Sequence, residues 1–181
     1  MSDEEEERPR RPSIQEAAED LPKNILGFGN PLLDLMTSGV AQSVLDEWGA
    51  ELNNAILAEE KHQPLFKKLV DDGLVTGYVA GGATLNSIRV AQWLLSFMDH
   101  GGCTGYLGCV GKDGFGDKMK EQLEADKVKA LFQTTEEKPT GTCAVLVKGG
   151  ERSLIANLAA AEKYDFAHFE SPQIQARGAA R

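Results

Sequence analysis

Cysteine is scarce in this sequence. Three cysteines occur among 181 residues, at Cys103, Cys109 and Cys143, and no two of them form a C-x-x-C pair. This spacing suggests neither a disulfide framework nor a zinc site, and it fits reduced thiols in a cytosolic or nuclear protein. We therefore predict no metal site and no disulfide.

Long apolar runs and an excess of basic residues are also missing. No stretch approaches the roughly 18 consecutive apolar residues of a membrane span, and the acidic N-terminus is unlike a transit peptide. The 19 Lys and Arg residues against 28 Asp and Glu residues give a net charge of −9, which argues against nucleic acid as a partner. We expect a cytoplasmic protein, with a nuclear location left open.

Several enzyme motifs are absent. The sequence has no G-x-x-x-x-G-K-[ST] loop, no G-x-G-x-x-G placed after a strand, and no G-x-S-x-G elbow. Three histidines, His62, His100 and His168, are scattered without metal-ligand spacing, and we expect them at the surface. The absence of these motifs argues against a protein with one of the common nucleotide-binding loops and against a serine hydrolase.

The first 21 residues form an acidic tail with almost nothing to bury. Residues 1–20 hold eight acidic and three basic side chains, so more than half of the net charge lies there. Such composition predicts disorder. The basic run at residues 8–12 is read either as a nuclear-import patch or as a solvated linker, and we favour the linker.

Residues 22–181 alternate between expected strands and helices. Strands are predicted over 24–29, 56–58, 75–80, 103–110 and 128–133, and helices over 41–48, 59–72, 84–98 and 115–125. Thr84 is expected to cap the helix over 84–98, whose apolar residues on two sides predict a mostly buried element. This alternation indicates an α/β fold.

The last third predicts a local antiparallel pair. Two apolar runs, 142–148 and 151–158, flank Gly149 and Gly150, which is the pattern of a tight hairpin. We expect a mostly parallel core with an antiparallel flap and a cleft between them.

Two glycine-rich stretches have the residue types of a ligand site. Residues 80–87 place Gly81 and Gly82 at a strand end and Asn86 one turn into a helix, so that a ligand can approach the backbone and meet an amide. Residues 108–117 place Asp113 where it would cap a helix. A plain strand-to-helix turn explains the first stretch equally well, and for the second it is the favoured explanation.

The order of these stretches resembles a known family. Gly-Gly-Ala-Thr-Leu-Asn at 81–86 followed by Gly-Cys-Val-Gly-Lys-Asp-Gly-Phe-Gly at 108–116 is similar to the first signature of the ribokinase-like (PfkB) carbohydrate and nucleoside kinases. The strings at 29–34, 56–59, 90–93, 139–143 and 152–159 resemble the adenosine kinases of that family. The resemblance runs from about residue 24 to about residue 164.

The resemblance implies a ribokinase-like three-layer α/β sandwich with a small antiparallel β lid, over about 30–60 and 138–158. Enzymes of this kind transfer the γ-phosphoryl group of Mg-ATP to the 5′-hydroxyl of adenosine, giving AMP in purine salvage. Asp34 would accept hydrogen bonds from the ribose 2′- and 3′-hydroxyls, and Arg152 would be the lid cation near the transferred phosphoryl group. The sugar pocket would contain Asn30, Gly81, Gly82 and Asn86. The purine would meet Leu57, Cys143, Leu154 and Ala156, which are equally explained as core residues.

The family's second signature, Asp-Thr-x-Gly-Ala-Gly-Asp, does not occur in these 181 residues. It would supply the catalytic aspartate, the anion-binding amides and part of the ATP site, and the sequence is thus expected to be an N-terminal portion. Because phosphoryl transfer depends on positioning and electrostatics, we expect no kinase activity from this chain alone.

Two alternatives stay open: a ribokinase-like kinase with another sugar or nucleoside acceptor, and a non-catalytic interaction module. The family is mostly monomeric, but an exposed sheet edge would let this chain self-associate.

Overall fold

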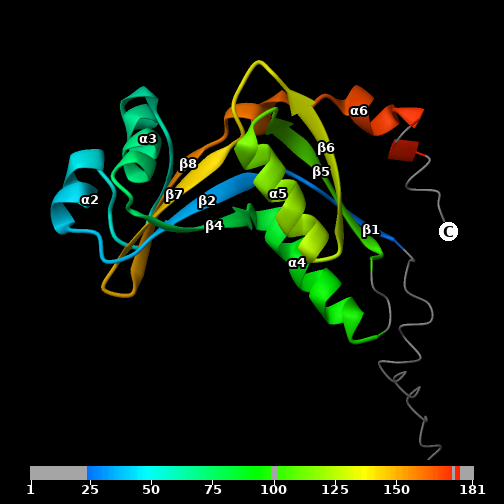
Figure 1. Ribbon diagram of the computed structural model, residues 1–181, viewed down its shortest axis with the longest axis horizontal. Helices are drawn as coiled ribbons and strands as arrows, with labels where there is room; N and C mark the ends of the chain where they lie inside the picture. The colour runs from blue at the N-terminus through cyan, green and yellow to red at the C-terminus, as the bar shows by residue number, and fades with distance from the viewer. Residues whose placement is uncertain (1–23, 99–101, 173, 176–181) are drawn as a thin grey trace, which may run out of the picture.

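The computed structural model describes residues 24–98, 102–172 and 174–175 (Figure 1). The acidic tail, its basic run and His100 lie outside the described residues. Within them the elements follow one another as β1 (Ile25–Phe28), β2 (Leu32–Thr37), α2 (Gln42–Trp48), β3 (Ala55–Leu57), η1 (Glu60–His62), α3 (Gln63–Asp71), β4 (Val75–Gly81), α4 (Ala83–Ser96), β5 (Thr104–Gly111), α5 (Gly114–Ala125), β6 (Val128–Thr135), β7 (Thr142–Lys148), β8 (Glu151–Asn157), η2 (Ala159–Lys163) and α6 (Phe166–Glu170).

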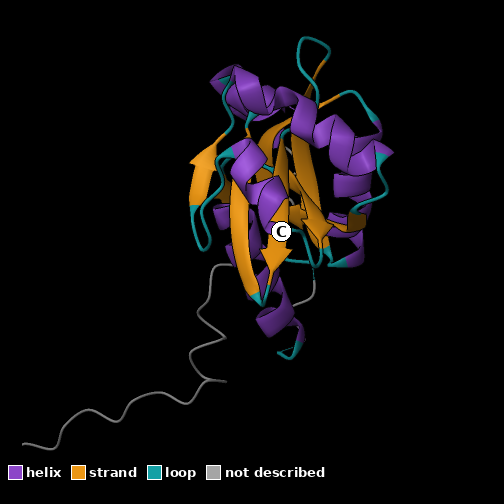
Figure 2. Ribbon diagram, turned by 90° about the vertical axis from the view of Figure 1, so that its left-hand side faces the viewer, coloured by secondary structure: helices purple, strands orange, loops and turns teal. Residues whose placement is uncertain are grey.

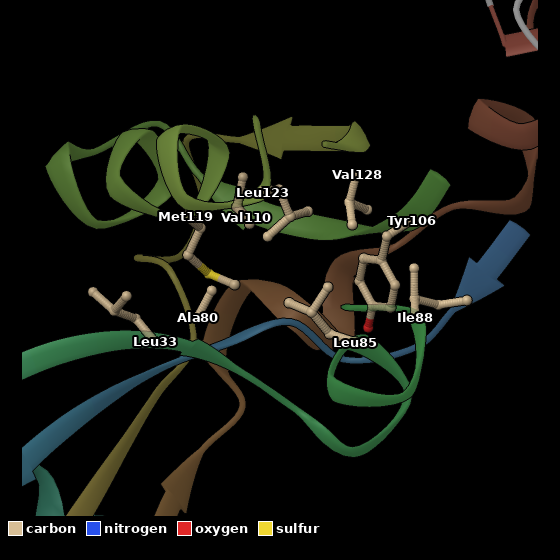
Figure 3. Packing of buried hydrophobic residues seen from close by; sticks show 9 residues of the cluster. All are labelled: Leu33, Ala80, Leu85, Ile88, Tyr106, Val110, Met119, Leu123 and Val128. Atoms are coloured by element: carbon tan, nitrogen blue, oxygen red, sulfur yellow. The ribbon is translucent and has the colours of Figure 1, made fainter. Parts of the chain in front are cut away.

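A parallel sheet of three strands forms one half of the molecule, in the order β1-β5-β6. Helices α4 and α5 cover one face of it (Figure 1). Figure 3 shows the core between them, where Tyr106 and Val110 of β5 meet Ile88 of α4 and Met119 of α5. On the other face a smaller cluster joins Leu107, Leu131, Tyr164, Phe169 and Ile174. The expected α/β architecture, with helical segments on both faces of a sheet, is confirmed.

A mixed sheet of five strands forms the other half, in the order β3-β8-β7-β2-β4. Strands β7 and β8 pair antiparallel, and the turn between them holds Gly149 and Gly150 at φ +60° and +87°, which confirms the predicted glycine hairpin. Helices α2 and α3 pack against one face of this sheet through Leu45, Leu65 and Leu69. Figure 2, along the long axis, shows strands in the middle of the molecule and helices on more than one side.

The position of β4 differs from the simple alternation of strands and helices. It pairs antiparallel with β2 at the edge of the five-stranded sheet instead of joining β5 and β6. Strand β2 itself was not predicted. Because β4 leads directly into α4, its end connects the five-stranded sheet to the helical layer of the other half.

Helix α4 corrects two predictions. Its N-cap is Gly82, and Thr84 lies inside the helix without a capping bond. The helix buries Leu85, Ile88, Gln92 and Leu95, but its second apolar side faces solvent, with Phe97 72% exposed. The exposed side chains on that side are Val90, Trp93, Leu94 and Phe97. The prediction of a mostly buried helix was therefore wrong, because one side of α4 is packed and the other is exposed to solvent.

His62 corrects the prediction of surface histidines, since it is only 1% exposed. Its Nδ1 accepts a hydrogen bond from the Glu59 backbone N–H at 2.8 Å, and its Nε2 lies 3.1 Å from the carbonyl oxygen of Trp48. Because Nδ1 accepts, the ring proton is assigned to Nε2, which donates to that carbonyl. The histidine thus ties the end of α2 to the start of η1.

Across the described ranges, no helix is long and apolar enough to cross a membrane.

Candidate functional site

The carboxylate of Asp34 lies against the backbone of Gly81. Asp34 is in the middle of β2, and Gly81 is the last residue of the neighbouring strand β4. A Cβ atom at Gly81 would fall 2.5 Å from Oδ2 and 2.7 Å from Oδ1 of Asp34, closer than real Cβ contacts allow. Only glycine lets the carboxylate occupy this place. Gly81, which the sequence pattern indicated as a ligand-site residue, is therefore also required for packing.

Gly82 makes the second close backbone approach. Its φ is +108°, and a Cβ atom there would lie 2.5 Å from the carbonyl oxygen of Asn30. Both the positive φ and the short distance require glycine. The segment before β2 and the turn from β4 into α4 are thereby held together, and Asn30, Asp34, Gly81 and Gly82 form one group.

Strand register places the other expected residues on the same face as Asp34. Asp34 pairs with Cys143, Cys143 with Ala156, and Ala156 with Leu57. Register partners point to one face of a sheet, and residues two apart on a strand share a face, which adds Leu154 and Arg152 of β8. This face is opposite to the one packed on α2 and α3, whose strand residues include Ala144, Leu146 and Ile155.

Burial is uneven along this row. Cys143 is buried and Asp34, Leu154 and Ala156 are half-buried, whereas Leu57 is 63% exposed and Arg152 is exposed. An anionic group, a mostly apolar strip and a cation therefore follow one another on one open face. The arrangement suits a ligand with vicinal hydroxyls at one end and a flat apolar part beside them.

The electrostatics of the face centre on Asp34. Burial raises the pKa of its carboxyl group from 3.8 to about 6, and the positive charges of Arg152 and Arg89 oppose that rise. Burial, together with the charge of Asp34, raises the pKa of the Cys143 thiol to about 12. At neutral pH Asp34 is therefore mainly ionised and Cys143 is an uncharged, small apolar side chain.

Asn86 lies apart from this row. It is exposed on α4 and lines a groove of about 500 Å³ together with Arg89, Val90, Trp93 and Asp126. In the described residues no hydrogen bond joins its side chain to Asp34. The structure thus brings the other predicted site residues onto one face or beside it, and leaves Asn86 on the neighbouring helix.

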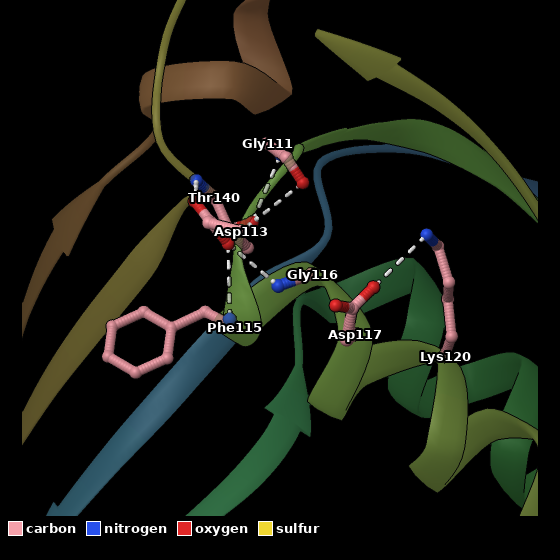
Figure 4. A network of polar contacts seen from close by, with 7 residues as sticks. All are labelled: Gly111, Asp113, Phe115, Gly116, Asp117, Lys120 and Thr140. Carbon is pink, nitrogen blue, oxygen red and sulfur yellow. Dashed lines mark hydrogen bonds and ion pairs between the residues drawn. The ribbon is translucent and has the colours of Figure 1, made fainter. Parts of the chain in front are cut away.

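The second glycine stretch forms a structural joint (Figure 4). Asp113 caps α5, as expected, accepting hydrogen bonds through Oδ1 from the N–H groups of Phe115 and Gly116 at 3.1 and 2.9 Å. It also accepts from the Thr140 hydroxyl at 2.7 Å and, through Oδ2, from the Thr140 N–H at 2.8 Å. Burial alone would raise the pKa of Asp113, but these bonds hold it below the ordinary value. Sequence reasoning missed Thr140, although it lies in the Pro-Thr-Gly-Thr-Cys string.

Among the described residues, no group of three or more His, Cys, Asp or Glu side chains is placed to hold a metal ion.

The α/β fold and the grouping of Asp34 with Gly81 and Gly82 agree with the resemblance to the carbohydrate and nucleoside kinases. A family model described as "pfkB family carbohydrate kinase" matches residues 46–180. The chain belongs to this family.

Curated relatives and solved structures narrow the similarity. The chain is 48% identical to adenosine kinase 1 of Arabidopsis thaliana over 157 residues, which cover 87% of this chain and 44% of that protein. It is 42% identical to the adenosine kinase of Dictyostelium discoideum, covering 84% and 43% of the two chains. The chain thus spans less than half the length of these relatives.

Among solved structures, Anopheles gambiae adenosine kinase in complex with P1,P4-di(adenosine-5) tetraphosphate matches with a TM-score of 0.77 and 41% identity, covering 85% of this chain and 46% of that one. The adenosine kinase of Schistosoma mansoni in complex with adenosine matches with a TM-score of 0.75 and 33% identity, covering 85% and 43%.

Proposed function

We propose that this chain forms the nucleoside-binding portion of an adenosine kinase, which transfers a phosphoryl group from ATP to adenosine and yields AMP and ADP. The observation that carries the proposal is the Asp34 carboxylate lying over the Gly81 backbone on an open sheet face. The similarity to adenosine kinases over more than four fifths of the chain supports it.

Asp34 recognises the ribose in this proposal. A carboxylate has two oxygens and accepts hydrogen bonds only, so it matches the two donor hydroxyls of a vicinal diol. Hydrogen bonds to an ionised acceptor are stronger than neutral ones. Backbone groups of Gly81 and Gly82 and the side chain of Asn30 complete the sugar end. Asn86 belongs to that end through its place in the first turn of α4, where its N–H donates to the Gly82 carbonyl oxygen at 2.9 Å.

The purine lies along the apolar strip. Four side chains supply this surface: Leu57, Cys143, Leu154 and Ala156. Because Leu57 is largely exposed, a planar base that covers it would remove apolar area from water. Arg152, exposed at the start of β8, supplies positive charge toward the transferred phosphoryl group. The face belongs to a lid over about 30–60 and 138–158.

ATP is the co-substrate of the proposed reaction and Mg²⁺ its usual metal. We assign the described residues to nucleoside binding and none of them to the metal. We expect the isolated 181-residue chain to bind adenosine without converting it to AMP, because its sequence lacks the aspartate and anion-binding amides that phosphoryl transfer requires. We place the protein in the cytoplasm, and a nuclear fraction stays open.

A second candidate function is that of an interaction module. Leu26 and Phe28 of β1 are exposed, and β1 has no second strand beside it among the described residues. Their backbone groups point to that edge, because the N–H groups of Ile25 and Gly29 bond to the segment of β5. A hollow of about 430 Å³ beside this strand is lined by Leu26, Thr104, Leu131, Phe169 and Ile174. Unpaired edges with apolar side chains recruit other strands, which favours self-association of this chain.

Isothermal titration with adenosine tests the primary function. We expect saturable binding at pH 7.5 that ribose competes for only weakly, because ribose has the diol and no base. Binding of ribose as tight as that of adenosine would favour another ribokinase-like acceptor. ATP-dependent formation of AMP by the purified chain, lost in Asp34→Ala, would overturn the expectation of binding without turnover.

A further inference from the structure

Both outward-facing backbone groups of Ala80 are held by side chains from helices. Ala80 is the next-to-last residue of the edge strand β4. Its N–H donates to Oε1 of Gln122 at 2.5 Å, and its carbonyl oxygen accepts from Nη1 of Arg89 at 2.6 Å. Gln122 belongs to α5 and Arg89 to α4, so two helices hold the end of one strand.

Gln122 replaces a neighbouring strand at this edge. Its Nε2 also donates to the carbonyl oxygen of Tyr78 at 3.0 Å, so that one amide satisfies an acceptor and a donor two residues apart. Arg89 is fixed in turn by an ion pair with Asp126, Nε to Oδ2 at 2.5 Å, just after α5. The edge of the five-stranded sheet is thereby tied to the helices that cover the three-stranded sheet. We call Gln122 and Arg89 the Ala80 clamp.

The clamp acts one residue away from the Asp34 contact, because Gly81 follows Ala80 directly. We propose that Gln122 and Arg89 are positioning residues of the nucleoside site, which fix the Gly81–Gly82 backbone against the Asp34 carboxylate. This inference rests on the proposed function for its ligand. It assigns a role to two side chains that do not lie on the ligand-binding face.

The two clamp residues act on the pKa of Asp34 in different ways. Removing Gln122 loosens the packing over the carboxylate and admits water, which lowers the pKa of Asp34 because burial is its main cause of elevation. Removing Arg89 loosens the same packing but also deletes a positive charge that lowers the pKa of Asp34, so its two effects on that pKa oppose each other. The other groups that act electrostatically with Asp34 are the Arg152 guanidinium and the Cys143 thiol, and both stay unchanged in these variants.

Gln133 provides a matched control. Its Nε2 donates to the carbonyl oxygen of Lys163 at 3.2 Å, and its Oε1 accepts from the N–H of Asp165 at 2.8 Å. It therefore bridges two backbone groups as Gln122 does, but on β6 and beside the segment between η2 and α6. Gln133→Leu and Gln122→Leu remove the same kind of hydrogen bond from different places.

The experiment follows two readouts in the 181-residue chain: the side-chain ¹³C titration of Asp34 by NMR and the adenosine Kd by calorimetry. For Gln122→Leu we expect a lower Asp34 midpoint and about tenfold weaker adenosine binding. For Arg89→Gln we expect similarly weakened binding with a smaller change in the midpoint, because lost burial and lost charge oppose each other, and for Arg89→Lys a midpoint close to that of the native chain. Gln133→Leu leaves both readouts unchanged.

The outcomes separate the clamp from the proposed function. Equal Asp34 midpoints and equal adenosine Kd values in Gln122→Leu and Gln133→Leu would overturn the clamp. If the native chain binds no adenosine while Gln122→Leu still lowers the Asp34 midpoint, the positioning role stands and the proposed function fails.

Discussion

The Thr140 hydroxyl donates to Oδ1 of Asp113 across 2.7 Å and also accepts from the Gly111 N–H at 3.0 Å. This contact joins the end of β5, the start of α5 and the segment that enters β7. Because α5 covers the three-stranded sheet and β7 lies in the five-stranded one, the pair links the two halves of the molecule.

We predict that Asp113→Asn destabilises the protein by about 2–3 kcal/mol at pH 7. Asparagine keeps an oxygen for the helix N–H groups, but its amide nitrogen would face the N–H of Thr140, donor to donor. Because the folded pKa of Asp113 is depressed, the stability it contributes is present above pH 3.8 and is lost as the pH falls through the folded value. Urea unfolding at pH 7 and pH 3 measures both effects.

Asp165→Asn is the control for that variant. Asp165 caps α6 through a single bond from the Ala167 N–H, so asparagine can replace it at a cost of about 0.5 kcal/mol or less. Equal losses in the two variants would show that Asp113 is an ordinary helix cap rather than a joint.

Gly81→Ala should abolish detectable adenosine binding. The new methyl group would displace the Asp34 carboxylate, which lies within 2.5 Å of its position. Gly77→Ala is the matched variant, since Gly77 lies on the same strand and the same sheet face with nothing within 4 Å of a Cβ atom. Calorimetry with both variants checks this, and adenosine binding by Gly81→Ala at native affinity would place the ligand elsewhere.

Asp34→Asn should stabilise the protein at pH 8 and have little effect near pH 4. The folded pKa of about 6 exceeds the ordinary 3.8, so the contribution of Asp34 to stability is full below pH 3.8 and is lost as the pH rises through 6. With solvent screening we expect a gain on the order of 1–2 kcal/mol at pH 8. Thermal unfolding of both chains at the two pH values measures this gain. If Asp34→Asn were less stable than the native chain at pH 8, the claim that the ionised, half-buried carboxylate destabilises the fold would be contradicted.

Self-association through β1 predicts that Leu26→Lys and Phe28→Lys each shift the chain toward monomer in sedimentation experiments. A charged side chain on an edge strand opposes strand addition. Trp93→Lys is the control, because Trp93 is about as exposed as Phe28 but lies on α4, far along the sequence from the edge. Dissociation by Trp93→Lys alone would identify the bare side of α4 as the contact.

Local signals in the sequence predicted the parts of the fold that depend on nearby residues. The Gly149-Gly150 hairpin and the Asp113 cap follow from turn and capping chemistry within a few positions. Strand β2 was missed because Pro31 precedes it and Asp34 interrupts its apolar residues. That carboxylate is only half-buried, because it lies on the sheet face away from α2 and α3.

Other features depend on long-range contacts that carry no local pattern. The bonds from Gln122 to Ala80 and Tyr78 span 42 and 44 positions. His62 is buried because it finds the carbonyl oxygen of Trp48, 14 residues earlier. The exposed side of α4 has the apolar pattern of a buried side. Periodicity shows that a side of a helix is apolar, but it does not show whether another element covers that side.

The pH dependence of adenosine binding tests the central role of Asp34 most directly. With a carboxyl pKa of about 6, the native chain should bind adenosine about tenfold more weakly at pH 5 than at pH 7.5, because protonation removes the charged acceptor of the diol. Asp34→Asn should bind weakly and with no such dependence. Adenosine affinity in the native chain that stays constant from pH 7.5 to pH 5, or that Asp34→Asn matches, would contradict the assignment of Asp34 to the ribose.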